Sequence, residues 1–331
     1  MAGRRRGRKD AFAATAGQNQ RMLDQVPVLD FAQVGTPAFA RDIYDAFVRY
    51  GFVVIANHSI DPKLTERFLG RYRDFFARPE PAKQRYHQPG GGGARGYTPF
   101  GIETAKGATH HDLKEFWHVG RELPPGHRLQ RYMPPNVWVD DLPGFRETSL
   151  AMFAAFDAMG LDLLRAIAVS LRLERDYFDD RVEAGNSILR VIHYPPMPPN
   201  PTASVRAGAH EDINVITLLM GAEEPGLQLL TRQGTWLDVN PAPGTLVINV
   251  GDMLQRLTNN VLRSTSHRVI NPPRERAANA RFSMPFFLHF NPEFEIRSLP
   301  QCVEVEGVDH YPIPITSDEY LQERLREIKL K

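Results

Sequence analysis

The chain contains little cysteine, no long apolar run and almost no net charge, and each shortage excludes a class of protein. Cys302 is the single cysteine among 331 residues, so no intramolecular disulfide can form and a reducing compartment such as the cytoplasm is expected. No apolar stretch approaches the roughly 20 residues that a membrane-spanning helix requires. The formal net charge of +1 does not indicate a nucleic-acid-binding body. We therefore expect a small-molecule partner; the oligomeric state stays open.

Positive charge is concentrated at the N-terminus, where a short stretch holds Arg4, Arg5, Arg6, Arg8 and Lys9. No apolar periodicity follows, so we expect residues 1–25 to form a disordered basic tail. A secretory signal is not expected, because no hydrophobic segment follows the charges. We favour a solvated tail over a nucleic-acid contact, because no aromatic residue lies among the charges.

Four further segments together predict an α+β fold. Residues 26–135 mix strands and helices, and residues 136–184 are dominated by one long helical pattern. Residues 185–296 change to short strands separated by proline, glycine and asparagine, which is typical of an antiparallel barrel or jelly roll. Residues 297–331 form a C-terminal extension with a helix. We therefore expect a double-stranded β-helix (jelly-roll) core buttressed by helices.

Hydrophobic periodicity locates the main helices. Apolar residues recur at helical spacing over residues 38–50, and Gly51 follows as a terminating residue. The longest pattern covers residues 145–173 and predicts a helix that packs on the core. A third amphipathic pattern over residues 317–331 predicts a terminal helix.

Three residues carry side chains that can ligate a metal. His210 and Asp212 lie two positions apart within residues 209–219, a run rich in β-branched and aliphatic residues. On a strand, alternate side chains share a face, so we expect both to point the same way. His267 lies 57 positions beyond His210, in a second strand-like run over residues 263–270. Two imidazoles and one carboxylate on one side of a metal are typical of non-haem Fe(II) oxygenases.

A candidate carboxylate-binding pair lies farther along the chain. Arg281 and Ser283 open a strand-like run and share one face of it. A guanidinium fork and a hydroxyl can grip a carboxylate. Tyr194 ends another strand-like run, over residues 187–194, and offers a further hydroxyl donor.

Several motifs occur in a characteristic order, and together they are more specific than any one alone. They include Tyr50-Gly51-Phe52 with Asn57-His58, Gly96-Tyr97, His210-x-Asp212, Asn249-Val250-Gly251-Asp252, Ser266-His267-Arg268-Val269 and Arg281-x-Ser283. In this order, the chain resembles the isopenicillin N synthase-like branch of the 2-oxoglutarate and Fe(II)-dependent dioxygenases, from about residue 26 to residue 295.

The resemblance implies a reaction and its cofactors. Fe(II) would be held by the three ligands, and 2-oxoglutarate would chelate it through the C1 carboxylate and keto oxygen. Arg281 and Ser283, assisted by Tyr194, would bind the C5 carboxylate. O2 would be the second co-substrate, and succinate and CO2 would be released. Hydroxylation, ring closure and desaturation all occur in this family.

Two features depart from the family pattern. Many plant members carry Asn-x-Tyr-Pro where this chain has Ile192-His193-Tyr194-Pro195, so only the tyrosine carries over. The gap between His267 and Arg281 is a few residues longer, which a polar turn would absorb. Neither departure touches the metal ligands.

The substrate contacts are expected on the same strand faces. Arg190 shares a face with Tyr194, and a buried arginine needs an anionic or multiply hydrogen-bonding partner. That partner is either a substrate carboxylate or an internal acid, and the sequence leaves both open. Phe287 and His289 continue the face of Arg281, and Tyr97 lies in a segment that resembles the pocket mouth of the family. We expect these residues to touch the substrate.

Three neighbours of the motifs are expected to be structural. Asp252 and Asn249 are predicted to stabilise the turn before a strand that carries Gln255. Arg268 follows His267 directly, so on a strand it must point away from the metal.

Other functions remain open at this point. An Fe(II) oxidase of the isopenicillin N synthase type needs no 2-oxoglutarate and would use Arg281 and Ser283 to hold its substrate; an ascorbate-dependent oxidase is a variant. A binding module without catalysis would usually have lost a metal ligand. A zinc hydrolase would need a general base beside the metal, and the expected pocket offers arginine and tyrosine instead.

Overall fold

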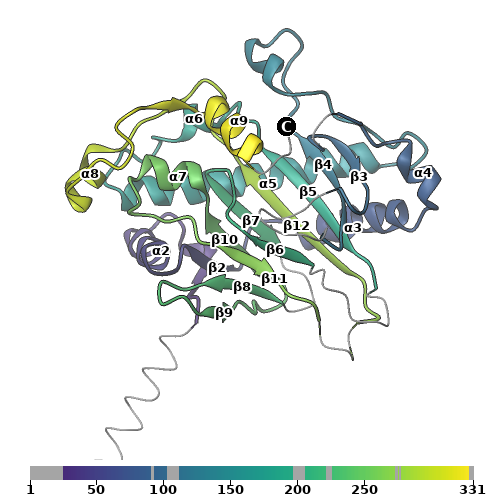
Figure 1. Cartoon of the computed structure of the whole chain (residues 1–331), viewed down its shortest axis with the longest axis horizontal. Coiled ribbons are helices and arrows are strands. Elements are labelled where there is room, and N and C mark those ends of the chain that lie inside the picture. The colour runs from purple at the N-terminus through teal and green to yellow at the C-terminus, as the bar shows by residue number, and fades with distance from the viewer. Residues whose placement is uncertain are drawn as a thin grey trace, which may run out of the picture.

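A computed structural model describes residues 25–90, 93–102, 112–196, 206–220, 226–272, 275 and 277–327. Residues 1–24 of the predicted tail and residues 328–331 of the predicted terminal helix lie outside the described residues. The strands form a large and a small sheet, with helices around them (Figure 1). This arrangement confirms the predicted α+β class.

The larger sheet has eight strands in the order β1-β2-β10-β7-β12-β5-β4-β3, and the smaller has four in the order β6-β11-β8-β9. The strands of the larger sheet are β1 (Val28–Asp30), β2 (Phe52–Ala56), β3 (Gly96–Thr98), β4 (Glu115–Gly120), β5 (Ile188–Tyr194), β7 (Ile216–Met220), β10 (Leu246–Val250) and β12 (Arg281–Leu288). The strands of the smaller sheet are β6 (Ala207–His210), β8 (Leu227–Leu230), β9 (Trp236–Asp238) and β11 (His267–Val269). A separate pair consists of β13 (Glu295–Ile296) and β14 (Ile315–Thr316).

Helices occur before, between and after the strands. The α-helices are α2 (Pro37–Tyr50), α3 (Pro62–Phe76), α4 (Glu80–Gln84), α5 (Phe145–Ser170), α6 (Asp179–Val182), α7 (Asp252–Leu257), α8 (Pro300–Glu306) and α9 (Ser317–Glu327). The described part of the chain also contains the short 3-10 helices η1 (Phe31–Gln33) and η2 (Arg128–Tyr132). None of the described helices is both long and apolar enough to cross a membrane.

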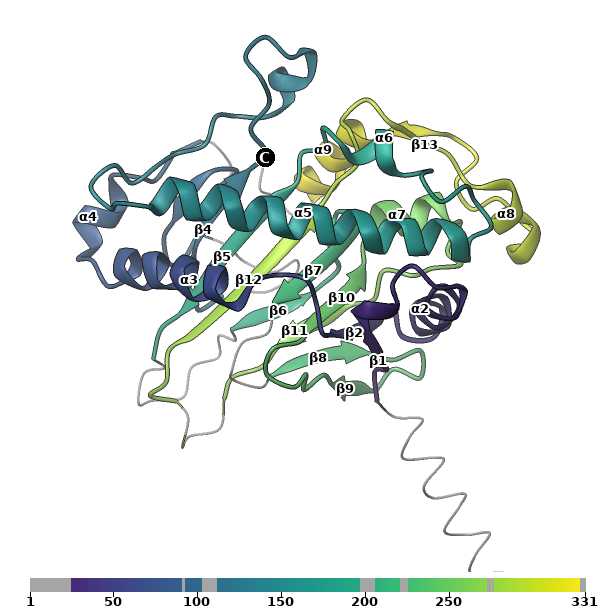
Figure 2. The same ribbon diagram turned by 180° about the vertical axis from the view of Figure 1, so that it is seen from behind.

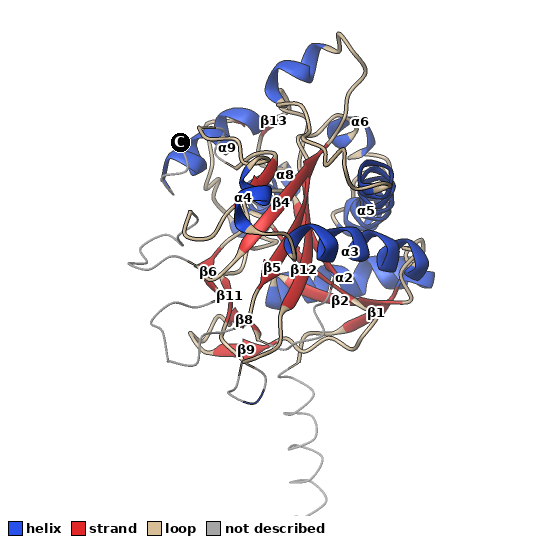
Figure 3. Cartoon of the chain, turned by 90° about the vertical axis from the view of Figure 1, so that its right-hand side faces the viewer, coloured by secondary structure: helices blue, strands red, loops and turns tan. Residues whose placement is uncertain are grey.

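Helices α2, α3 and α5 lie on one side of the larger sheet, and the smaller sheet lies on the other (Figures 2 and 3). The helical side is apolar: Phe156 of α5 stacks on Phe286 of β12, with the ring centroids 5.6 Å apart. Gly160 allows a close approach, because a Cβ there would lie 2.5 Å from Leu288 Cδ1. Burial of these apolar side chains holds the helices against the larger sheet. The opposite face of this sheet, toward the smaller sheet, is therefore available for the functional site.

The predicted helices are confirmed, with small shifts at their ends. Thr36 caps the N-terminus of α2, and Gly51 ends it in the left-handed region at φ 68°. A side chain at Gly51 would also collide with Thr265, because its Cβ would lie 2.2 Å from Thr265 Oγ1. Helix α5 begins at Phe145 as predicted and ends three residues before the predicted end.

The structure corrects the prediction that residues 209–219 form one strand. Strand β6 ends at His210, β7 begins at Ile216, and Asp212 lies in the loop between them. The loop is held by α7, whose backbone N–H groups at Asp252 and Met253 donate to the carbonyls of Asp212 and Asn214. Its polar residues favour such a turn over a ladder, so strand alternation does not align the first two ligands.

Two smaller predictions also change. The strand-like run over residues 263–270 shortens to His267–Val269. The segment after Gly251, predicted as a turn before a strand, is the helix α7, and Gln255 lies within it. A Cβ at Gly251 would lie 2.0 Å from Asn214 Oδ1, so only glycine allows the helix to start against the loop.

Candidate metal and co-substrate site

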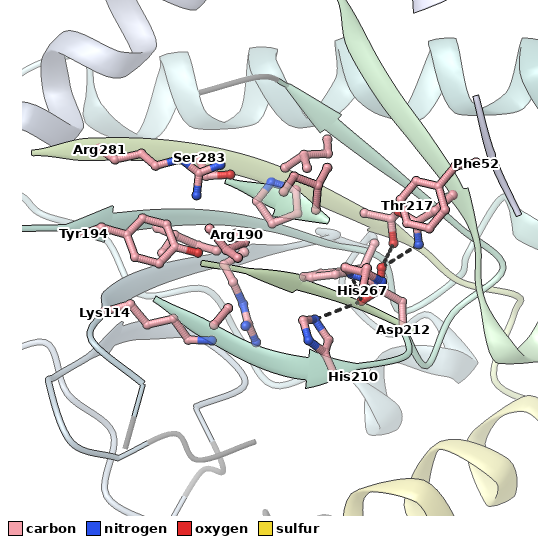
Figure 4. Close-up of a pocket in the computed structure, with 18 residues that line it drawn as sticks. Phe52, Lys114, Arg190, Tyr194, His210, Asp212, Thr217, His267, Arg281 and Ser283 are labelled. Atoms are coloured by element: carbon pink, nitrogen blue, oxygen red, sulfur yellow. Dashed lines mark hydrogen bonds and ion pairs between the residues drawn. The ribbon is translucent and has the colours of Figure 1, made fainter. Parts of the chain in front are cut away.

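The three predicted ligands converge on one point between the sheets. His210 ends β6 and lies opposite His267 of β11 in the antiparallel pair, and Asp212 comes from the following loop (Figure 4). Asp212 Oδ1 lies 3.7 Å from His210 Nε2 and 3.8 Å from His267 Nε2. One ligand atom from each residue lies within 4.8 Å of the others, a spacing that can hold a metal ion.

Backbone carbonyls orient both imidazoles. His210 Nδ1 lies 2.8 Å from the Gly208 carbonyl oxygen, and His267 Nδ1 lies 3.1 Å from that of Thr265. In each ring, Nδ1 therefore carries the hydrogen and donates a hydrogen bond to the carbonyl. The lone pair of Nε2 is then the one that can bind a metal. Phe52 packs edge-on against the His267 ring at 5.4 Å and restricts its rotation.

The two oxygens of the Asp212 carboxylate have different surroundings. Oδ2 accepts hydrogen bonds from Thr217 Oγ1 at 2.5 Å and from Asn249 Nδ2 at 2.8 Å. Burial alone would raise the pKa of Asp212, but His267, His210 and these two donors outweigh it and hold the pKa below its usual value. The carboxylate is therefore ionised at neutral pH, with Oδ1 facing the imidazoles.

His210 is kept neutral by its surroundings. Desolvation, and next the nearby His267, lower its pKa, although 40% of its side chain is exposed. Neutral imidazole and ionised carboxylate are the forms that bind a divalent metal. His210 and Asp212 are thus both in the form that binds a metal.

A pocket extends from the three ligands between the sheets, with an empty volume of about 570 Å³ including its open mouth. Alternate residues of two neighbouring strands form one wall: Arg190, Ile192 and Tyr194 from β5, and Arg281, Ser283, Pro285 and Phe287 from β12. This alternation confirms the predicted strand faces. Figure 4 places Arg281, Ser283 and Tyr194 at the end of the pocket away from Asp212 and His267.

The far end of the pocket can hold a carboxylate. Arg281 pairs in register with Tyr194, and its guanidinium lies 5.1 Å from the centre of the Tyr194 ring. Arg281 is only 5% exposed and Ser283 only 4%. A shielded guanidinium beside a hydroxyl binds an anion more strongly than an exposed one.

Arg190 lies between the two ends of the pocket (Figure 4). Its Nε donates to His118 Nε2 at 2.5 Å, and its guanidinium lies 4.3 Å from the Phe116 ring centre and 5.3 Å from that of Phe287. His118 Nδ1 in turn donates to the Gly93 carbonyl at 2.5 Å, so Nε2 carries the lone pair that accepts the hydrogen bond from Arg190. The chain thus fixes the Arg190 side chain in the pocket.

Comparison with known proteins agrees with this geometry. One matching family model is described as the N-terminal region of non-haem dioxygenases in morphine synthesis and covers residues 26–141; another, the 2OG-Fe(II) oxygenase superfamily, covers residues 185–290. The 2-oxoglutarate-Fe(II) type oxidoreductase hxnY of Emericella nidulans is 33% identical, over 89% of this chain and 88% of the relative. The chain belongs to the 2OG-Fe(II) oxygenase superfamily.

Solved structures place this oxygenase among enzymes with the same fold. A 2OG-Fe(II) oxygenase family protein of Caulobacter crescentus is 52% identical with a TM-score of 0.85, covering 91% of this chain and 98% of that one. A full-length Neurospora crassa protein, solved in complex with alpha-KG, is 33% identical with a TM-score of 0.79, covering 90% and 95%. The predicted jelly-roll core is confirmed, and this oxygenase is a dioxygenase that depends on Fe(II), 2-oxoglutarate and O2.

Two of the predicted substrate contacts lie elsewhere in this oxygenase. Tyr97 is fully buried in the hydrophobic core, where its hydroxyl donates to Glu115 Oε2 at 2.5 Å. Aromatic side chains of α3 surround it, so it is a core residue. His289 lies one residue beyond β12, is 5% exposed, and its Nδ1 is 3.1 Å from the Phe287 carbonyl. It does not line the pocket, because the strand alternation has ended there.

Some residues of the site gave no distinct sequence signal. Asn249 was expected to stabilise a turn, although family members sometimes aim this position at the pocket; it donates to the metal ligand Asp212, and Thr217 does the same from β7. Lys114 lines the pocket just before β4 and pairs with Asp112 at 2.9 Å. As expected, Arg268 points away from the metal and lies over the Trp236 ring.

Proposed function

We propose that this oxygenase oxidises a C–H bond of a small molecule that carries a carboxylate, using Fe(II) held by His210, Asp212 and His267. The convergence of these three side chains supports the metal assignment. When bound, Fe(II) with O2 and 2-oxoglutarate supplies the oxidising power, and succinate and CO2 are released. Hydroxylation is the simplest outcome; ring closure or desaturation would use the same site.

The residues at the far end of the pocket would orient 2-oxoglutarate. Arg281 and Ser283 would hold its C5 carboxylate, with the Tyr194 hydroxyl assisting. Their burial excludes water from this contact and strengthens it. The co-substrate would thus be fixed before the substrate arrives.

The charged side chains of the pocket are the observation that supports an anionic substrate. Fe(II) brings two positive charges and Arg281 one, while 2-oxoglutarate brings two negative charges and Asp212 one. Lys114 is compensated by Asp112. Among the described residues that line the pocket, Asp212 is the sole acid. The guanidinium of Arg190 is held in the same pocket, and a guanidinium is well suited to bind a substrate carboxylate.

Anaerobic binding of 2-oxoglutarate to the Fe(II)-loaded protein tests the co-substrate assignment. We expect the weak visible absorption band of keto-acid chelation, and its loss in Arg281→Ala at the same concentration. Arg268→Met is the matched control, because its side chain lies on Trp236 away from the pocket. If iron binds but no band forms in the wild type, the assignment of Arg281 and Ser283 to the C5 carboxylate is wrong, and these two residues would hold the substrate instead.

Succinate release tests the substrate class. A panel of small carboxylic acids and their uncharged amides would be screened at saturating 2-oxoglutarate. We expect acids to stimulate succinate release, and Arg190→Met to raise their KM with a smaller change in kcat, because Arg190 would contribute ground-state binding. Stimulation by the amides alone would refute the carboxylate.

A neutral heterocycle is the second candidate substrate. The N. crassa protein was also solved with alpha-KG and thymine, in a structure that is 33% identical to this chain with a TM-score of 0.79. The Phe287 ring could stack on such a heterocycle. The Arg190 guanidinium could donate hydrogen bonds to its carbonyl oxygens. Thymine therefore belongs in the screen, and turnover with thymine but with none of the acids would favour this candidate.

A further inference from the structure

Strand β6 carries the metal ligand His210 at the edge of the smaller sheet. Within the described part of the chain, β6 pairs with β11 alone. The register of that pairing shifts between His267 and Val269, so the ladder is irregular beside the ligands. An edge strand with an irregular ladder is weakly fixed by its backbone hydrogen bonds. Something else must hold it if His210 is to keep its position.

A buried carboxylate holds the outer edge of β6. Asp112 Oδ1 accepts a hydrogen bond from the backbone N–H of Gly208 at 3.2 Å, where a neighbouring strand would otherwise supply the acceptor. Asp112 Oδ2 binds Lys114 Nζ at 2.9 Å. Both side chains are about as buried as the core, with 6% and 7% of their surface exposed. This contact joins the segment before β4 of the larger sheet to the smaller sheet.

The same glycine orients the metal ligand. The carbonyl of Gly208 accepts the hydrogen bond from His210 Nδ1 at 2.8 Å. Asp112 therefore binds the N–H of Gly208, and the C=O of the same glycine orients the His210 ring. A shift of Gly208 would turn the ring and move Nε2 away from the metal position.

We propose that Asp112 is a positioning residue for the iron ligand His210, acting through Gly208, and that Lys114 is its counter-ion. This inference rests on the assignment of Fe(II) to the three ligands. Lys114 lines the same pocket as His210, so the carboxylate also offsets a positive charge that would repel the metal. Asp112 does not touch the metal, and its effect on catalysis is indirect.

Metal binding by the apoprotein tests the inference without turnover. Mn(II) would serve as the probe, with free Mn(II) measured by its electron paramagnetic resonance signal. We expect Asp112→Ala to raise the Kd by about tenfold or more, because residues that orient a ligand typically contribute 10–100-fold to metal affinity. Asp157→Ala is the matched control. Asp157 is an aspartate of α5, remote from the ligands, and it pairs with Arg121 at 2.6 Å. Its substitution should leave the Kd unchanged.

Two further variants separate the hydrogen bond from the charge. Asp112→Asn/Lys114→Met keeps an acceptor for Gly208 and removes both charges, so it should bind Mn(II) within about threefold of the wild type. Asp112→Ala/Lys114→Met lacks the acceptor and should stay weak. Equal affinities in these two variants would refute a role for the hydrogen bond, as would an unchanged Kd in folded Asp112→Ala.

Asp112→Asn keeps the inference testable if Asp112→Ala does not fold. This variant retains the acceptor but leaves Lys114 uncompensated, so it should bind Mn(II) more weakly than the wild type. Removing the Lys114 charge as well, in Asp112→Asn/Lys114→Met, should restore the affinity. A failure to restore it would overturn the role of Lys114 as the counter-ion.

His210→Ala separates this inference from the metal assignment. Loss of Mn(II) binding in His210→Ala, with wild-type affinity in Asp112→Ala, would overturn the positioning role and leave the site intact. Wild-type affinity in His210→Ala would overturn the metal assignment itself.

Discussion

At the scale of single residues, the Asp212 carboxylate depends on two donors that no metal-site motif includes. Thr217 Oγ1 and Asn249 Nδ2 both bind Oδ2 and hold the pKa of Asp212 down. Thr217→Val keeps the shape of the side chain but removes one donor. We expect its Mn(II) affinity to fall by about tenfold, and by more at mildly acidic pH, because the carboxylate becomes easier to protonate.

Thr231→Val is the control for this prediction, because Thr231 lies on the β8–β9 turn and bonds Thr235 away from the site. Its affinity should equal that of the wild type at every pH. A Thr217→Val protein that loses affinity equally at all pH values would show that the hydroxyl does not act through the protonation of Asp212.

The co-substrate residues allow a second prediction at this scale. Ser283→Ala removes one neutral donor from the proposed carboxylate contact, whereas Arg281→Ala removes a charged fork. Hydrogen bonds to charged groups contribute about 1.5–3 kcal/mol each, so we expect the KM for 2-oxoglutarate to rise by about tenfold in the first variant and far more in the second. Iron affinity, measured separately, should change in neither; a parallel loss would point to a general distortion of the pocket.

Sequence alone identified the residues whose chemistry and spacing are distinctive. The period of two on β12 correctly placed Arg281 and Ser283 on one face. The same rule was wrong for Asp212, which it placed on a strand with His210. Asp212 lies in the loop between β6 and β7. The contacts of Asn249 and Thr217 with Asp212 could not be recognised, because amide and hydroxyl side chains are common on strands and the sequence does not show which residue they bind.

At the scale of elements, the C-terminal helix α9 supports the loop that carries Asp212. Arg324 of α9 lies 3.1 Å from Asp252, the first residue of α7, which in turn binds the loop through its backbone N–H. Asp252 is 2% exposed, and burial raises its pKa to about 6 even with Arg324 beside it. This carboxylate therefore depends on its cationic partner.

Arg324→Met should lower the free energy of unfolding by about 2 kcal/mol, less than for a fully buried pair because part of Arg324 reaches solvent. Denaturant unfolding at neutral pH measures it. Adding Asp252→Asn should recover most of the loss, since no buried charge then remains. Arg326→Met on the same helix changes an exposed residue whose Nε donates to a backbone carbonyl, and it should leave the stability unchanged. A similar loss there would mean that α9 is sensitive to any substitution.

Elements were more predictable than their connections. Apolar periodicity located α2, α5 and α9, because each presents one apolar face to the core. It could not reveal that residues 211–215 leave the strand, since the apolar residues of that run are compatible with either path. The tertiary contact with the N-terminus of α7, distant in sequence, decides between them.

At the scale of the whole molecule, the site joins the two sheets. His210 and His267 belong to the smaller sheet, and the loop that carries Asp212 leads into β7 of the larger one. A bound metal would therefore link both sheets and bind the folded state far better than the unfolded chain. The sequence indicated the jelly-roll class, but the closure of the sheets on one metal appears only in the three-dimensional arrangement.

Mn(II) at a hundred times its Kd should then stabilise the protein by about 2.7 kcal/mol. For a chain of this size, we expect the midpoint of thermal unfolding to rise by about 4 °C. 2-Oxoglutarate added with the metal should raise it further. Asp212→Ala should abolish both increments, whereas Arg281→Ala should keep the first and lose the second. If 2-oxoglutarate alone gave its full increment in the metal-free protein, the co-substrate would bind without the metal. The proposed chelation of the metal by 2-oxoglutarate would then be wrong.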